Sequence, residues 1–110
     1  MNGYYELKRA GSTEFMFNLK AGNHETILTS QRYSSKEGAQ NGIASVQENS
    51  PQADKYEKKV AKDESPYFVL TAGNGLVIGT SEMYSSASAR DNGIESVHTN
   101  GPTKTIKEVE

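Results

Sequence analysis

Two rows of amide and hydroxyl side chains are the residues of this sequence whose types and spacing best suit binding chemistry. Within each row the residues recur at every fourth position, which places them on one face of a helix. The rows are Asn41, Ser45 and Asn49, and, 51 residues later, Asn92, Ser96 and Asn100. Amides and hydroxyls donate and accept hydrogen bonds, so each row could hold a polar ligand or satisfy nearby backbone.

Two interpretations of these rows are open. Gly42 and Gly93 stand in mid-helix, where Gly costs up to about 1 kcal/mol relative to Ala. In the structural interpretation these glycines let the helices approach the sheet or each other, the polar side chains bond to nearby backbone, and the last Asn of each row caps its helix. In the functional interpretation the rows line a two-fold symmetric groove for a peptide, a small ligand or a protein partner. The candidate binding residues of that groove are Asn41, Ser45, Asn92 and Ser96.

Histidine and serine chemistry is not favoured, so we expect no enzyme, no cofactor and no metal site. His24 and His98 are the only histidines, there is no cysteine, and a zinc site normally needs three or four nitrogen or sulfur ligands. A nucleophilic serine needs an adjacent base and an oxyanion hole. No base is placed near both copies of the serines that recur in the two halves. These serines are Ser30, Ser34, Ser81 and Ser85.

A strip of basic residues provides the alternative function, binding of single-stranded nucleic acid. Its members are Lys8, Arg9, Lys20, Lys58, Lys59 and Lys62, with Tyr5 and Tyr56 interleaved. Neighbouring acidic residues cancel much of its field, which favours a solvated sheet edge. The glycines at 73, 75 and 79 resemble a phosphate loop only superficially, because they join two strands and not a strand to a helix.

A tandem repeat organises all of these residues. Phe17 to Asn23 aligns with Phe68 to Asn74, and the same offset of 51 residues continues without a gap to Pro51 and Pro102. Each repeat is predicted to contain three strands and a helix, followed by a charged strand. The predicted strands cover residues 4–9, 15–20, 27–33, 55–61, 77–84 and 103–109, and the second strand of the second copy begins near Pro66.

The helix boundaries are predicted from end signals. Ser34 and Glu37 match a capping box, and Ser85 occupies the same position in the second copy. Pro51 and Pro102 forbid continuation, and the Asn two residues earlier suits a left-handed helix end. The apolar faces of these helices should lie on the sheet. Their larger members are Ile43, Val46, Ile94 and Val97.

Composition bounds the remaining function classes. The chain has 110 residues, 34% of them hydrophobic, and a net charge of -2, so no overall charge draws it to nucleic acid or membrane. No segment approaches the roughly 20 apolar residues of a membrane span, and the start lacks a secretory signal. The absence of cysteine suits a reducing compartment. We therefore expect a cytoplasmic protein without a membrane partner.

The doubled motifs resemble those of the YegP-like family of small uncharacterised bacterial proteins, in its duplicated subfamily. The shared pattern runs Leu-Lys-Ala-Gly-Asn, Glu-Thr-Ile-Leu-Thr-Ser, Tyr-Ser-Ser, Asn-Gly-Ile-Ala-Ser-Val and Asn-Ser-Pro. The resemblance implies an α+β fold of two tandem β-β-β-α-β units that share one mainly antiparallel sheet, exchange their C-terminal strands and pack two helices on it. It implies no activity and no functional residues.

The exchange of strands has a physical reason, because one repeat of roughly 50 residues buries too little apolar surface to form a stable core by itself. We expect a single domain over residues 1–110, with repeat 1 at about 3–53, repeat 2 at about 54–104 and a C-terminal strand at 103–109. The duplicated chain should be a monomer that pairs its halves internally. Its expected role is that of a non-catalytic binding or interaction module with a protein or peptide partner, ahead of nucleic acid.

Overall fold

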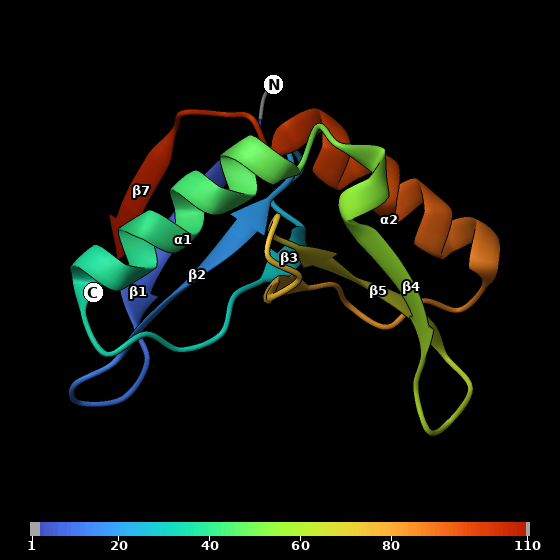
Figure 1. The fold of residues 1–110 in the computed structure, drawn as a ribbon, viewed down its shortest axis with the longest axis horizontal. Helices are drawn as coiled ribbons and strands as arrows, with labels where there is room; N and C mark the ends of the chain where they lie inside the picture. The colour runs from blue at the N-terminus through green and yellow to red at the C-terminus, as the bar shows by residue number, and fades with distance from the viewer. Residues whose placement is uncertain (1–2, 110) are drawn as a thin grey trace.

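Seven strands form one sheet, and two helices pack on it (Figure 1). The computed structural model describes residues 3–109. The first half contains β1 (Tyr4–Arg9), β2 (Phe15–Lys20), β3 (Thr26–Thr29) and α1 (Lys36–Asn49). After a 3₁₀ turn (Ala53–Lys55), the second half contains β4 (Tyr56–Val60), β5 (Pro66–Thr71), β6 (Val77–Thr80), α2 (Ala87–Asn100) and β7 (Ile106–Val109). The α+β fold of two tandem units that the sequence predicted is therefore confirmed.

The sheet is built around an internal pseudo-two-fold axis. Its strand order is β4-β5-β6-β3-β2-β1-β7. Because β4, β5 and β6 are the repeat counterparts of β1, β2 and β3, the first six strands form two equivalent halves placed symmetrically about the centre of the sheet. The two halves meet where Thr29 pairs with Thr80, its own counterpart in the repeat. The helices diverge from C-terminal ends that meet near this axis (Figure 1). Each helix also contacts strands of the other half, which joins both repeats in one core.

The core lies between the sheet and the two helices. Alternation along β2 and β5 buries Phe17, Leu19, Phe68 and Leu70 on the helix face, as period-2 patterns require. The helices contribute Ile43, Val46 and Val97, which are buried as predicted, whereas Ile94 is only partly buried at the margin of the same cluster. Removing one half would expose apolar surface on the other.

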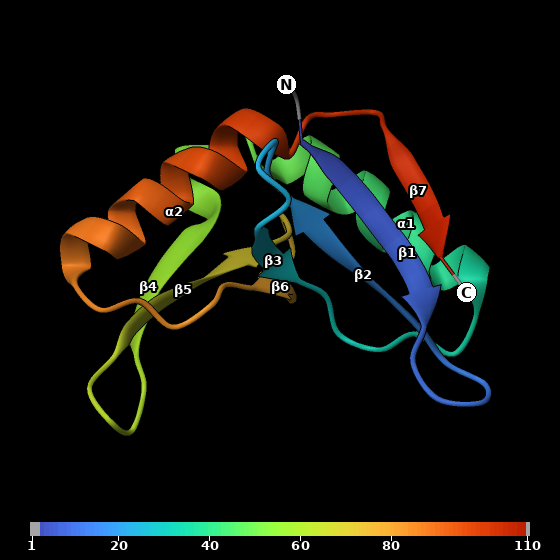
Figure 2. The same cartoon turned by 180° about the vertical axis from the view of Figure 1, so that it is seen from behind.

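The chain crosses between the halves after each helix. After α1 it continues as β4, the first strand of the second half, and after α2 it returns as β7 to lie parallel to β1 (Figure 2). Two reciprocal hydrogen bonds accompany the crossings. The Tyr5 hydroxyl donates to the carbonyl oxygen of Gly101 at 2.6 Å, and the Tyr56 hydroxyl donates to that of Ser50 at 2.7 Å. Each tyrosine therefore satisfies a carbonyl at the C-terminal end of a helix.

Both helix ends differ from the sequence prediction. The N-caps are Ser35 and Ser86, not Ser34 and Ser85, and their side chains accept hydrogen bonds from Gly38 and Ala89 at 3.0 Å. In α1, the Tyr33 side chain packs against Gly42, where a Cβ would overlap it. At the other end, the C-caps Ser50 and Gly101 keep right-handed helical angles, so the predicted left-handed Asn caps are wrong.

The third strands are also shorter than predicted. They end at Thr29 and Thr80. The next residue in each copy, Ser30 or Ser81, uses its side-chain hydroxyl to accept a hydrogen bond from the backbone of the neighbouring strand. Ser30 Oγ accepts from the backbone N–H of Phe17 at 2.9 Å, and Ser81 Oγ accepts from that of Phe68 at the same distance. Both hydroxyls also donate to the following carbonyls, which leaves them bound within the backbone and unsuited to nucleophilic chemistry.

Candidate binding site

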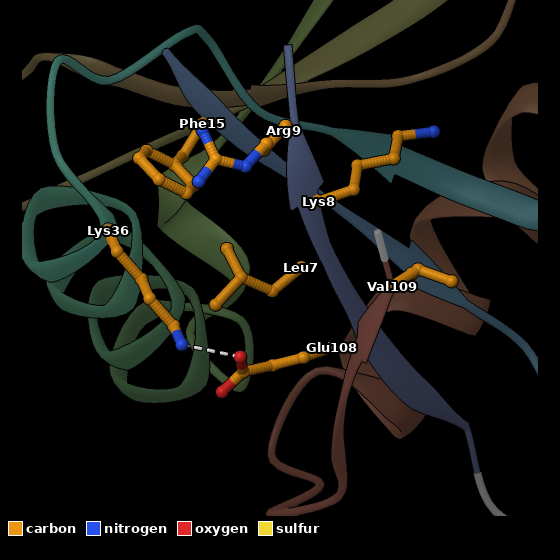
Figure 3. A pocket seen from close by; sticks show the side chains of 7 residues that line it. All are labelled: Leu7, Lys8, Arg9, Phe15, Lys36, Glu108 and Val109. Atoms are coloured by element: carbon orange, nitrogen blue, oxygen red, sulfur yellow. Dashed lines mark hydrogen bonds and ion pairs between the residues drawn. The ribbon is translucent and has the colours of Figure 1, made fainter. Parts of the chain in front are cut away.

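A pocket lies at one corner of the sheet, where β1, β7 and the start of α1 come together (Figure 3). Its volume is about 140 Å³. We call it the β7 pocket, and its lining consists of Leu7, Lys8, Arg9, Phe15, Lys36, Glu108 and Val109. Strand alternation separates these residues by face, so Lys8 and Val109 point away from the space that Leu7, Lys36 and Glu108 share (Figure 3).

The strand pairing and the helix start position these groups. The parallel register of β1 and β7 places Leu7 opposite Glu108, and Leu7 is buried to form an apolar floor. Lys36 is the first residue of α1, and its ammonium group donates a hydrogen bond to the Glu108 carboxylate. On the other side the Arg9 guanidinium lies over the Phe15 ring, 5.3 Å from the centroid. The pocket therefore combines two cations, one carboxylate and an apolar floor.

The ion pair in the pocket is exposed to water. The side chains of Lys36 and Glu108 retain 46% and 54% of their accessible surface. Exposed pairs of this kind contribute about 1 kcal/mol or less, because water and salt screen the attraction. The Glu108 carboxylate can therefore be exchanged for another carboxylate at small cost.

The residues of the first half that line the β7 pocket are not repeated in the second half. At the matching positions of the second half, Arg9, Phe15 and Lys36 are replaced by Val60, Pro66 and Ala87. Sequence reasoning missed this site, because Glu108 is 72 residues from Lys36 and its charge was attributed to a protected strand edge. The difference between the two copies at these three positions was the signal that could have found it.

The predicted polar rows are used in part by the protein itself. The Asn49 amide donates to the carbonyl oxygen of Ser45 at 2.8 Å, and the Asn100 amide donates to that of Ser96 at the same distance. Asn100 Oδ1 also accepts from the backbone N–H of Gly3 at 2.9 Å. The last Asn of each row, Asn49 or Asn100, thus has the structural role considered above.

The first Asn of each row is accessible to solvent. Asn41 and Asn92 are exposed, and each lies eight residues before the last Asn of its row. The binding role of Asn41, Ser45, Asn92 and Ser96 stays a prediction. The close approach expected at the mid-helix glycines is confirmed, because a Cβ on Gly42 or Gly93 would overlap a tyrosine ring from the sheet side.

The tyrosines of the predicted basic strip serve the core. Tyr5 is fully buried, and Tyr56 is half-buried with its hydroxyl bound to Ser50. Burial is the main cause that raises the pKa of both hydroxyls above their ordinary value, helped by Tyr56 for the first and by Glu95 for the second. Neutral, bonded and packed rings do not offer the stacking platforms on which single-stranded nucleic acid binding depends.

The histidines lie apart from each other. His24 occupies a β-turn at φ 70°, where Gly75 stands in the second copy at φ 84°, and its Nδ1 is 3.0 Å from the Tyr4 hydroxyl. His98 is exposed on α2. Within residues 3–109 no group of three or more His, Asp or Glu side chains is arranged to hold a metal ion. In the same part of the chain, neither helix has the length and apolar character of a membrane span.

Comparison with known proteins shows one family over most of the chain. The model of the domain of unknown function DUF1508 matches residues 10–57 and again residues 61–108. A UPF0339 protein of Shewanella oneidensis is 58% identical over 99% of both chains, and the UPF0339 protein YegP of Escherichia coli K12 is 51% identical over 98% of both.

Solved structures agree with the fold. The solution NMR structure of the Shewanella oneidensis UPF0339 protein superposes with a TM-score of 0.92 and covers 98% of this chain and 92% of that chain. The solution NMR structure of YegP, described as a protein of unknown function, has the same TM-score and covers 98% of this chain and 93% of that chain. Both relatives therefore share this fold, and their names state no activity.

Proposed function

We propose that this chain, which belongs to the UPF0339 family of DUF1508 proteins, is a non-catalytic binding module that takes a small carboxylate into the β7 pocket. The observation that carries this proposal is the carboxylate already seated there, since Glu108 accepts a hydrogen bond from Lys36 above the apolar side chain of Leu7. A ligand carboxylate can take the place of Glu108 on Lys36 and gain a second cation in Arg9.

The size of the pocket limits the ligand. Its 140 Å³ is close to the roughly 150 Å³ of an engineered protein cavity that holds benzene. A carboxylic acid with a short carbon chain fits this space, with its apolar end against Leu7 and Phe15 and its carboxylate toward Lys36. The pocket therefore suits a short carboxylic acid.

The setting of this module follows from composition and pairing. We place it in the cytoplasm, as the absence of cysteine suits a reducing compartment. We also expect a monomer, because the two repeats already bury their apolar faces against each other. Both statements are testable by fractionation of the native cell and by measurement of molecular mass in solution.

A titration with 4-methylpentanoate tests the pocket. Backbone amide signals of the ¹⁵N-labelled protein should shift in a saturable way at Leu7, Arg9, Lys36 and Glu108, whereas 4-methylpentan-1-ol should have little effect. Lys36→Gln should abolish the response. The matched control is Lys104→Gln, which removes an exposed lysine outside the pocket and should bind like the wild type.

Glu108→Gln separates binding from simple strand docking. If Glu108 competes with the ligand for Lys36, the neutral variant should bind 4-methylpentanoate more tightly, by about 3-fold to 5-fold. Equal responses to the acid and the alcohol, or no response at Lys36, would refute the carboxylate site. Loss of all β7 signals in Glu108→Gln would show that the ion pair only fastens the strand.

A further inference from the structure

The outer edge of β4 lacks the strand that its counterpart possesses. β1 and β4 are equivalent in the repeat, and Tyr5, Glu6 and Lys8 recur as Tyr56, Glu57 and Lys59. β1 pairs with β2 on one side and with β7 on the other, whereas β4 pairs only with β5 and ends the sheet. Alternate backbone N–H and C=O groups along β4 therefore face outward without a strand partner within residues 3–109.

The duplication itself explains the missing strand. The residues that match β7 in the first copy lie at positions 55–58, and these already form the end of the 3₁₀ turn and the start of β4. The two-fold symmetry provides two positions for a C-terminal strand, one beside β1 and one beside β4. The tandem chain has a strand for the first position only. Figure 2 shows β7 beside β1 at one end of the sheet and β4 at the other, where β4 is the last strand in the strand order.

We propose that the β4 edge, residues Tyr56–Val60, binds an extended segment of a partner protein that adds to the sheet parallel to β4, as β7 adds to β1. β7 provides the template for its chemistry. In the β1·β7 register Glu6 faces Lys107 and Leu7 faces Glu108. On β4 the same register places Glu57 and Lys58 at these two positions, so a strand with the pattern apolar, basic, acidic, apolar meets an opposite charge at both.

The surroundings of the β4 edge fit this occupant. Lys58 points to the helix face, where its ammonium group is 3.4 Å from Asp91 of α2 in a pair that is half-exposed on both sides. Such a pair can open to admit an acidic residue from the incoming strand. Val60 is 65% exposed at the end of the strand, and an apolar residue one position beyond this four-residue pattern would face it. This edge is distant in the strand order from the β7 pocket, so the two proposals stand independently.

A peptide copy of β7 tests the edge. The acetylated and amidated peptide Thr-Lys-Thr-Ile-Lys-Glu-Val, which has the sequence of residues 103–109, is added to the ¹⁵N-labelled full chain. We expect saturable shifts at residues 56–60 and at the start of α2, and none along β1. A control peptide with its central Lys and Glu exchanged keeps the composition and should bind about tenfold more weakly.

Charge reversal on the protein completes the test. The double variant Glu57→Lys and Lys58→Glu should reverse the preference and bind the exchanged peptide more tightly than the original one. Both positions are exposed, so the fold is expected to persist. Three results would overturn the proposal: no shift at residues 56–60 at millimolar peptide, shifts along β1 caused by displacement of β7, or a doubled molecular mass without peptide, which would give the edge to a second copy.

Discussion

Leu28 and Gly79 are equivalent residues of the two repeats, and they meet across the pseudo-two-fold axis. Leu28 is 1% exposed, and a Cβ built on Gly79 would lie 2.5 Å from Leu28 Cδ2. A two-fold axis places a residue next to its own repeat counterpart. The space between these two positions holds one leucine side chain, that of Leu28. Ser50 and Gly101 form a second such pair at the helix ends, where a Cβ on the glycine would overlap the Ser50 side chain. Duplication allows these paired positions to differ.

Substitution of Gly79 tests the tightness of the axis. Gly79→Ala should lower the free energy of unfolding by about 1 to 3 kcal/mol, the usual cost of overpacking a core, although Ala suits a strand better than Gly. Urea denaturation measures the change. Exchange of the pair, Leu28→Gly with Gly79→Leu, should recover most of the loss expected from the sum of the single variants. Additive losses would show that the two positions do not share one space.

At the scale of the elements, the tyrosine of each first strand ties a strand of one half to the end of a helix. The Tyr5 bond to Gly101 spans 96 residues of sequence and connects β1 to α2. Burial, and then Tyr56, raise the pKa of Tyr5 above its ordinary value of 10.0. The folded protein therefore holds this proton more tightly than the unfolded chain, which contributes stability below pH 10 that is lost as the pH rises beyond it.

Tyr5→Phe should show both parts of this contribution. Near pH 7 the variant should lose about 1 to 2 kcal/mol of unfolding free energy, because the Gly101 carbonyl is left without its partner. Above pH 10 its stability should fall less steeply than that of the wild type, by about 1.4 kcal/mol per pH unit. Urea titrations from pH 7 to 11 measure both effects.

The control for this series is Tyr67→Phe, which changes a half-buried tyrosine whose hydroxyl has no hydrogen bond within residues 3–109. It should behave like the wild type at both ends of the pH range. If Tyr5→Phe declines above pH 10 as steeply as the wild type, the buried hydroxyl does not govern alkaline unfolding.

At the scale of the molecule, the two halves complete one interior. The helices reach across the axis, and the C-terminal strand returns to the first half, so neither repeat closes its own core. Near the axis, Leu28 of the first half packs against Gly79 of the second, and Ser50 packs against Gly101. Two first halves together would place two isobutyl groups in a space for one, and two second halves would leave that space empty.

Division of the chain before Asp54 tests this dependence. Residues 1–53 alone should give a poorly dispersed ¹H–¹⁵N spectrum in dilute solution, because the apolar faces of Leu28 and Phe17 lose their cover. Mixed with residues 54–110, they should recover the spectrum of the intact protein. A well-ordered monomer of residues 1–53 would show that the first repeat folds by itself.

Local patterns in the sequence were sufficient for the elements. Alternation around Phe17 and Phe68 and apolar spacings of three and four around Ile43 and Val97 specify strands and helices, since each depends on residues close in the chain. The offset of 51 residues specifies the duplication, because it is read by direct comparison of two segments. The N-caps lie one residue later than predicted, because two adjacent serines can both cap and local sequence does not distinguish them.

The sequence by itself thus determined which segments form strands and helices and that they occur twice. Tertiary structure decided where the copies stop being equivalent: the β7 pocket, the uncovered β4 edge and the one-sided packing at the axis. The reason is physical. Those features arise from pairings such as Lys36 with Glu108 and Leu28 with Gly79, between residues far apart in sequence, and periodicity within a single segment carries no information about them.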